Sequence, residues 1–271
     1  MATVTVNDIE LFYERRGAGE PLLLIMGMSG TSAHWGEPFL ELLERDFEVI
    51  VYDHRGIGQS APYMTPFTIR ELAADALALL DALAVPRAHV YGISMGGMVA
   101  QELVLAAPER VTTLTLGCTY PGGPEGVMTA PADMQMLGEA FASRDRDRTL
   151  RALYDVNVSA AYAADPANYD VFLERGRENP ASTSYIALQG QAIAGHDASG
   201  RLGEITAPTV VVHGTEDRML PVANAEVIGR LMPGARVEIM EGIGHLYFWE
   251  RPEESAALMR ALAASATPTA S

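Results

Sequence analysis

The segment 88–100, AHVYGISMGGMVA, constrains the fold of this chain more than any other part of the sequence. A short β-rich run over 89–93 leads into helical sequence from Met95 to Ala106. The turn between them, 92–96, reads G-I-S-M-G, a G-x-S-x-G pattern with glycine at both flanking positions. In a strand–turn–helix such a serine projects its hydroxyl above the sheet edge, where flanking side chains would collide. The pattern therefore predicts Ser94 as a nucleophile at the start of a helix.

A nucleophile of this kind requires donors for the negative charge that develops on the substrate. The helix that begins at Met95 offers unpaired N–H groups at its positive end. We expect the Met95 N–H to be one oxyanion donor. The second should come from the loop after the apolar strand 22–26, and Met28 is the favoured candidate.

A serine hydroxyl also needs an adjacent base, and that base needs a carboxylate. His245 lies in the glycine-flanked loop 241–246, directly after a buried strand. Asp217 follows another buried strand, with Glu216 as its rival. Strand ends of parallel sheets collect catalytic groups, so Ser94, Asp217 and His245 are predicted to meet there as nucleophile, acid and base.

The remaining five histidines are weaker candidates. His34 and His54 lie in loops near the same sheet edge and are candidates for pocket walls. His89 and His213 fall in predicted strands, where a structural role is expected, and His196 falls in the segment between the two halves of the strand–helix pattern.

Strands and helices alternate along most of the chain, which indicates an α/β fold with a mostly parallel sheet. A hairpin is predicted around Asn7-Asp8. The remaining strands are predicted at 22–26, 47–52, 88–93, 111–116, 209–213 and 236–240, and the helices of this part at 32–45, 69–83, 95–106, 222–232 and 252–264, with a frayed tail over 266–271.

Between 120 and 205 the alternation stops. The segment opens with Pro121-Gly122-Gly123-Pro124, a break signal, and then carries helical patterns. Helices are predicted at about 132–143, 147–163, 168–178 and 183–195. We therefore predict a core formed by 1–121 and 206–271 and a helical cap formed by 122–205.

Composition excludes several classes of protein. The net charge of −16 disfavours nucleic acids and anionic membrane surfaces as partners. All 19 cationic residues are arginine, which excludes a Schiff-base or P-loop lysine, and no Cys/His cluster has zinc-site spacing. No 18-residue apolar run and no signal peptide is found. The single cysteine, Cys118, excludes an internal disulfide and suits the cytoplasm.

Taken together, five motifs resemble those of the α/β-hydrolase superfamily, and the resemblance extends over nearly the whole chain. They are LLLIMGMSG at 22–30, DHRGIGQS at 53–60, GISMGG at 92–97, HGTEDRMLP at 213–221 and GIGHLYFWERPEE at 242–254. The sequence is most similar to the capped esterase, lactonase and enol-lactonase branch. Many members have His-Gly where this chain has Met26-Gly27, and the resemblance implies a structural role for Asp53 to Gly56.

The resulting hypothesis is a serine esterase or lactonase that uses water and no cofactor or metal on a small-molecule substrate. Its substrate is expected to be hydrophobic, because adaptable methionines are frequent. Three alternatives stay open: a carbon–carbon hydrolase on a vinylogous diketone, a cofactor-free perhydrolase, and a non-catalytic receptor. A homodimer also stays open. The predicted pocket residues are Gly27, Trp35, Met128, Met134, Met219 and Tyr247.

Overall fold

The computed structural model describes residues 2–178 and 182–266. Its centre is an eight-stranded sheet with the order β1-β2-β4-β3-β5-β6-β7-β8. β1 and β2 form an antiparallel hairpin, β2 pairs antiparallel with β4, and all other neighbours are parallel. The predicted fold class is confirmed. The strands are β1 Ala2–Val6, β2 Ile9–Gly17, β3 Glu20–Ile25, β4 Phe47–Tyr52, β5 Ala88–Ile93, β6 Val111–Gly117, β7 Thr209–Gly214 and β8 Ala235–Met240.

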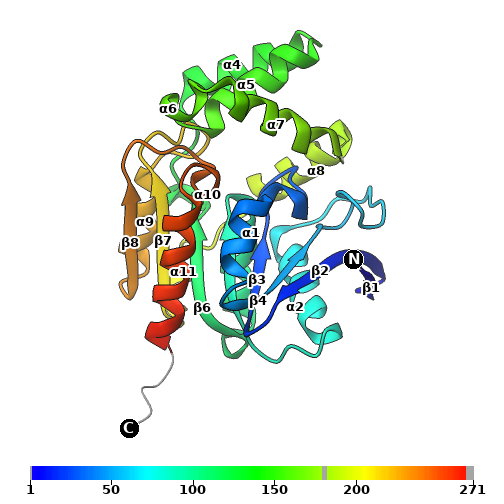
Figure 1. Cartoon of the computed structure of the whole chain (residues 1–271), viewed down its shortest axis with the longest axis vertical. Coiled ribbons are helices and arrows are strands. Elements are labelled where there is room, and N and C mark those ends of the chain that lie inside the picture. The colour runs from blue at the N-terminus through cyan, green and yellow to red at the C-terminus, as the bar shows by residue number, and fades with distance from the viewer. Residues whose placement is uncertain (1, 179–181, 267–271) are drawn as a thin grey trace.

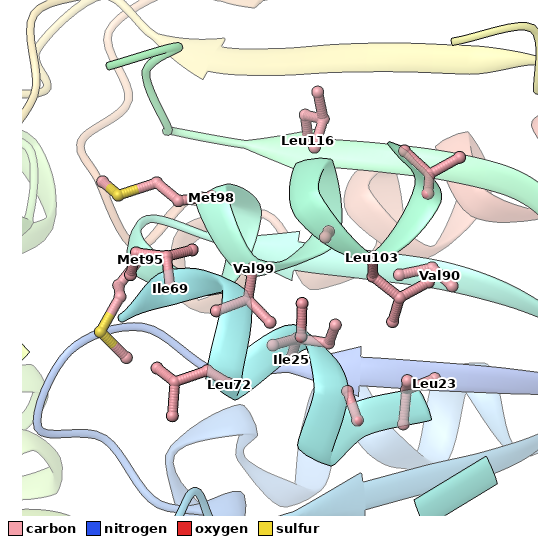
Figure 2. Packing of buried hydrophobic residues seen from close by; sticks show 14 of the residues in the cluster. Leu23, Ile25, Ile69, Leu72, Val90, Met95, Met98, Val99, Leu103 and Leu116 are labelled. Atoms are coloured by element: carbon pink, nitrogen blue, oxygen red, sulfur yellow. The ribbon is translucent and has the colours of Figure 1, made fainter. Parts of the chain in front are cut away.

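Helices cover both faces of this sheet (Figure 1). One face packs on α2 (Ile69–Ala82), α3 (Met95–Ala106) and α9 (Ala223–Leu231), and the other on α1 (Glu37–Leu43), α10 (Tyr247–Glu250) and α11 (Pro252–Ala266). Side chains alternate between the faces along each strand. In β3, for example, Leu23 and Ile25 join the first core, and Leu22 and Leu24 join the second. Figure 2 shows the first core, where α2 and α3 meet β3 and β5.

In the described part of the segment between β6 and β7, five α-helices lie on one side of the core (Figure 1). We call them the cap helices: α4 Pro131–Ala142, α5 Arg146–Asn157, α6 Ala160–Ala163, α7 Pro166–Glu178 and α8 Thr183–Ala194. Short 3-10 helices complete the fold: η1 Ser32–Trp35, η2 Pro108–Arg110, η3 Gly123–Glu125 and η4 Leu202–Glu204. The cap boundaries at 122 and 205 stay a prediction, and residues 267–271 of the expected frayed tail lie outside the described residues.

Two predicted helices are wrong because each is interrupted. The helix expected over 32–45 is split into η1 and α1 at Gly36, whose φ of 78° no regular helix contains. The helix expected over 147–163 ends at Asn157, because Val158 is extended and Ser159 caps the separate helix α6. Both breaks lie where another part of the chain approaches: the Arg175 side chain lies against Gly36, and Glu250 binds Ser159.

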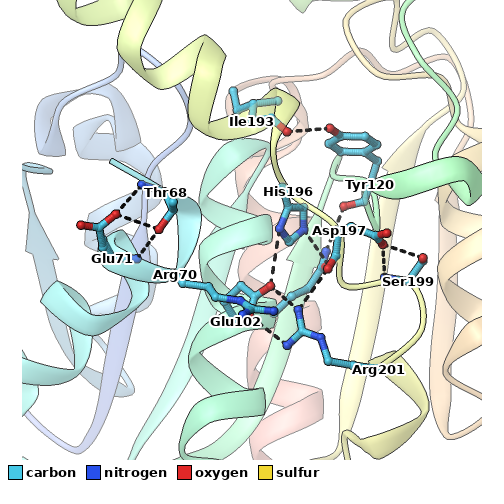
Figure 3. Close-up of polar contacts among 11 residues, drawn as sticks. Thr68, Arg70, Glu71, Glu102, Tyr120, Ile193, His196, Asp197, Ser199 and Arg201 are labelled. Atoms are coloured by element: carbon cyan, nitrogen blue, oxygen red, sulfur yellow. Dashed lines mark hydrogen bonds and ion pairs between the residues drawn. The ribbon is translucent and has the colours of Figure 1, made fainter. Parts of the chain in front are cut away.

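A buried carboxylate joins the end of the cap to the core (Figure 3). Glu102 of α3 is 4% exposed and accepts two hydrogen bonds from Arg201, of 3.0 and 2.5 Å. Arg70 lies 3.3 Å and His196 3.7 Å from the same carboxylate. The segment that returns from α8 to η4 is therefore attached to α3. Within the described residues, no helix is long and apolar enough to cross a membrane.

Candidate active site

Ser94 occupies a strained turn between β5 and α3. Its φ and ψ are 55° and −123°, a conformation that L-residues rarely adopt. A Cβ at Gly92 would lie 2.1 Å from the Gly96 carbonyl oxygen, and one at Gly96 would lie 2.0 Å from that of Ile25. The two glycines are therefore required by close backbone approach. In the fully described stretch 88–104, Ser94 is the one residue that is not buried.

The residues on either side of Cys118 hold the Ser94 backbone. The Gly117 carbonyl oxygen accepts the Ser94 N–H at 2.9 Å, and the Thr119 hydroxyl donates to the Ser94 carbonyl at 2.7 Å. Cys118 between them is buried and has a φ of 40°. One side-chain atom each of Cys118, Asp217 and His245 lie within 4.8 Å of one another. The end of β6 therefore contacts both Ser94 and the Asp217–His245 pair.

Asp217 and His245 form a buried hydrogen-bonded pair after β7 and β8. The Nδ1 atom of His245 lies 2.7 Å from Oδ2 of Asp217. Since a carboxylate only accepts, Nδ1 carries the proton, and Nε2 of a neutral His245 is left as a base. The other carboxylate oxygen accepts the N–H groups of Met219 and Leu220 at 2.9 and 2.8 Å. The Asp217 carboxylate is thus fixed by its own loop.

The environment keeps Asp217 ionised. Burial acts to raise its pKa, but the neighbouring imidazoles of His245 and His213 outweigh burial and hold the pKa well below its usual range. His213 shares its Nε2 proton between the Leu220 carbonyl, at 2.8 Å, and Asp217, at 3.1 Å. The predicted structural role of His213 is confirmed, and its contact with the acid is an addition that a strand position alone could not indicate.

The same contacts explain the cluster of Cys118, Asp217 and His245 without a metal ion. Both oxygens of Asp217 and Nδ1 of His245 already have hydrogen-bond partners. Burial raises the pKa of the Cys118 thiol well above its ordinary value, so this sulfur is neutral and a poor ligand. We therefore regard the cluster as an acid–base pair with a buried thiol packed against it.

The loop after β3 lies directly against Ser94. A Cβ added to Gly27 would be 3.1 Å from Cβ and 3.7 Å from Oγ of Ser94. His54 is buried and its Nε2 lies 3.0 Å from the Met26 carbonyl oxygen, so it holds the start of the loop. Gly27, one of the predicted pocket residues, therefore lies beside Ser94, and His54 supports the loop from behind instead of lining an open wall.

The two predicted backbone donors follow Ser94 and its neighbour Gly27 in the sequence. Met95 follows Ser94 as the first residue of α3, and Met28 follows Gly27. Within the described part of the chain, neither N–H group donates a hydrogen bond to another protein atom. Met95 is buried, and Met28 is 36% exposed. The N–H groups of both predicted donors are thus unpaired within the described residues, and their role as oxyanion donors stays a prediction.

The His245 loop is tied to the cap through Glu250 of α10. One oxygen of this buried carboxylate accepts the N–H groups of Gly244, at 3.0 Å, and Ser159, at 2.9 Å. Its other oxygen accepts the Ser159 hydroxyl at 2.5 Å. Burial raises the pKa of Glu250, although the hydrogen bonds from these donors act to lower it. Sequence analysis missed this residue, because the acidic side chain lies in a helical pattern that is typical of a solvated surface.

The predicted pocket residues fall into three groups. Trp35 and Tyr247 are fully buried in the aromatic core with Tyr91, so Trp35 packs the interior and does not form a wall. Tyr247 reaches the end of β6, where its hydroxyl lies against Gly117. Three methionines belong to the cap side: Met128 and Met134 are 60% and 54% exposed, and Met219 packs against the apolar side chains of α4 and α5.

The DHRG segment is structural, as expected. The two oxygens of Asp53 accept the N–H groups of Ser32 and Gln59 at 2.6 and 2.8 Å. Arg55 binds Asp75 of α2 through two hydrogen bonds of 2.6 and 2.7 Å. These contacts hold the loops after β3 and β4 in place.

Two cavities lie where the segment between β6 and β7 meets the core. One, of about 400 Å³, is lined by cap residues such as Met136 and Ser159 together with Glu216 and Arg218, the two neighbours of Asp217. The other, of about 370 Å³, lies between α2, α3 and His196. Neither is lined by Ser94.

Residues 20–252 match the family model of the alpha/beta hydrolase fold. The chain belongs to this family. It is 32% identical over 274 residues to Rhodomycin D methylesterase DauP of Streptomyces sp., covering 89% of this chain and 91% of that protein. A putative carbamate hydrolase, RutD of Azorhizobium caulinodans, is 30% identical over 268 residues, covering 91% and 92%.

Among solved structures, Est816, described as an N-acyl homoserine lactone degrading enzyme, superposes with a TM-score of 0.78 at 29% identity. The match covers 96% of this chain and 99% of Est816. Members of the esterase and lactonase branch are thus similar over the full length of this hydrolase, and the predicted resemblance is confirmed.

Proposed function

We propose that this hydrolase cleaves a carboxylic ester or lactone of a small-to-medium hydrophobic substrate, with Ser94 as nucleophile, His245 as base and Asp217 as acid. One observation carries the proposal. The residues that flank Cys118 bind the Ser94 backbone, and Cys118 itself packs against the Asp217–His245 pair. A half-buried serine, an imidazole and an ionised carboxylate are thereby joined by one strand end.

In the proposed reaction, the Ser94 hydroxyl attacks the carbonyl carbon while its proton passes to Nε2 of His245. The carbonyl oxygen becomes an oxyanion, which the N–H groups of Met28 and Met95 stabilise. When the intermediate collapses, the C–O bond to the alcohol breaks and His245 returns the proton to the leaving oxygen. Water, deprotonated by His245, then attacks the acyl carbon. The bond from that carbon to Oγ of Ser94 breaks, His245 returns the proton to Ser94, and the carboxylic acid leaves. No cofactor takes part in the scheme.

The substrate class follows from the residues beside the loop after β3 and from the relatives. Met28 exposes an apolar side chain next to Gly27, and Met128, Met134 and Met219 present more on the cap side. The similar proteins act, by their names, on a methyl ester, a carbamate and an acyl lactone. Ester and lactone share the carbonyl and alkoxide that the proposed reaction needs. A homodimer and a cytoplasmic location stay predictions.

A hydrolysis panel of p-nitrophenyl esters and acyl lactones tests the proposal. We expect the wild type to cleave members of the panel and Ser94→Ala to lose the activity, with Ser265→Ala, an exposed serine of α11, as matched control. A fluorophosphonate should label the wild-type protein, and peptide mapping should place the label on Ser94. Equal hydrolysis by Ser94→Ala and wild type would refute the mechanism.

A further inference from the structure

Gln189 is a buried polar side chain beside the candidate site that the proposed reaction does not use. It lies on α8, the last of the cap helices, and is fully buried. Its Oε1 atom accepts the N–H of Ser29 at 2.8 Å, across 160 residues of sequence. Ser29 directly follows Met28, the proposed oxyanion donor. A cap side chain therefore holds the loop on which the proposed oxyanion site depends.

The Ser29 N–H also fixes the orientation of the Gln189 amide. Because that group is a donor, the amide must turn its oxygen towards it and its nitrogen away. The Nε2 atom is buried and has no hydrogen-bond partner among the described residues. Buried amide donors are almost always paired, since leaving one unpaired is costly. An acceptor supplied by a bound molecule would remove this cost.

Neighbouring contacts hold Gln189 in place. Tyr185, one turn earlier on the same face of α8, packs on Gly56, where an added Cβ would lie 2.1 Å from its ring. Its ring also lies 5.6 Å from that of Phe67. Ser29 has a φ of 61°, so the loop that Gln189 binds is in a conformation that needs support. A fixed helix and a strained loop thus meet through one amide.

We propose that Gln189 is a positioning and specificity residue for the hydrolysis. Its Oε1 holds the Met28 loop in the form that stabilises the oxyanion, and its Nε2 donates to a second carbonyl oxygen of the substrate, close to the ester or lactone that is cleaved. The preferred substrates are therefore acyl compounds with an additional carbonyl near the scissile one, such as 3-oxoacyl esters. This inference rests on the proposed function.

A pair of esters separates the two roles: methyl 3-oxohexanoate, which has the second carbonyl, and methyl hexanoate, which lacks it. The intrinsic reactivity of each ester is the same for every variant. Changes in the ratio of kcat/KM for methyl 3-oxohexanoate to that for methyl hexanoate therefore report the hydrogen bond donated by Nε2 of Gln189. The kcat on methyl hexanoate, which lacks the second carbonyl, reports how well Gln189 holds the Met28 loop. Gln191→Met, an exposed glutamine on the same helix, is the matched control for Gln189→Met.

We expect Gln189→Met to lower the kcat on both esters and to reduce the ratio by about two- to tenfold relative to Gln191→Met, the range that one net hydrogen bond gives. Gln189→Glu keeps an acceptor for Ser29 but loses the donor. Gln189→Glu should therefore also lose the preference for methyl 3-oxohexanoate, and it serves as the second variant if Gln189→Met does not fold.

The specificity role would be overturned if the ratio of kcat/KM for the two esters were equal in the wild type, Gln189→Met, Gln189→Glu and Gln191→Met. An unchanged kcat on methyl hexanoate in Gln189→Met would overturn the positioning role. In both cases wild-type hydrolysis and fluorophosphonate labelling at Ser94 leave the proposed function intact. A wild type that neither hydrolyses the esters nor labels at Ser94 refutes the proposed function, and this inference fails with it.

Discussion

Protonation of His196 should destabilise the fold in mildly acidic solution. The ring is 5% exposed and packs edge-on against Tyr120, with its Nε2 3.4 Å from the side-chain oxygen of Gln101 (Figure 3). Burial lowers the pKa of His196 to about 4, although the Glu102 carboxylate acts in the opposite direction and Arg201 adds to the lowering. The folded protein therefore binds this proton less well than the unfolded chain does.

The sign and size of the effect follow from linkage. With a pKa of about 4 when folded and an ordinary value of 6.5, the contribution of His196 to stability is complete above pH 6.5. It is lost progressively as the pH falls from 6.5 to 4, because the unfolded chain takes up the proton first. At about 1.36 kcal/mol per pH unit, the loss from pH 7.5 to pH 5 is about 2 kcal/mol.

Urea unfolding of wild type and His196→Gln at pH 7.5, 6 and 5 measures this contribution. Other titrating groups, such as His34 and Glu250, are present in both proteins and cancel in the difference. We expect the wild type to lose about 2 kcal/mol more unfolding free energy than His196→Gln between pH 7.5 and 5. Parallel pH profiles for the two proteins would show that burial of this ring does not lower its proton affinity, and the reasoning would fail.

Four further substitutions give distinct outcomes. Gly96→Ala would place a Cβ 2.0 Å from a β3 carbonyl oxygen and should lower the unfolding free energy by about 1–3 kcal/mol. Gly138→Ala, on exposed α4 with open space around it, should raise the unfolding free energy by about 0.5–1 kcal/mol. Calorimetry that gives both changes the same sign contradicts this. Ser159→Ala removes the hydroxyl that donates to the buried Glu250 carboxylate and should lower the free energy of unfolding in urea by about 1–3 kcal/mol. An unchanged free energy of unfolding would contradict this. Asp217→Asn should lower kcat by about 10⁴-fold with unchanged circular dichroism, and a kcat near that of wild type would exclude Asp217 as the acid.

The sequence predicted the sheet and the Ser94 turn because their signals are local. Strands buried on both faces appear as continuous apolar runs, and β4 and β5 begin and end where such runs do. The turn at Ser94 needs glycine at two close backbone approaches, and these glycines are visible in the sequence. Asp217 and Glu216 follow the same buried strand, so the sequence pattern alone separated them poorly. In the structure Glu216 binds the Ala160 N–H instead.

What the sequence did not predict depends on contacts between distant segments. The break at Gly36 accommodates an arginine of α7, and the break at Ser159 exists because Glu250, 91 residues later, binds its backbone and hydroxyl. Gln189 lies in an amphipathic helical pattern that gives no sign of its contact with Ser29. Side chains that link the cap to the core carry no periodic signal, because their positions follow from the relative placement of two units.

These links have a common consequence for reactivity, because within the described residues the cap binds three of the four segments that carry the proposed catalytic groups, all except the turn at Ser94. Gln189 binds the loop of Met28, the Asn157 carbonyl accepts the N–H of Leu246 at 2.9 Å, and Arg218, next to Asp217, donates to the Asp155 carbonyl at 3.3 Å. A cap that only covered the substrate would change KM when altered. Since here the cap also holds the loops in place, replacing it by that of a relative should lower kcat as well, until the partners of these loops are restored.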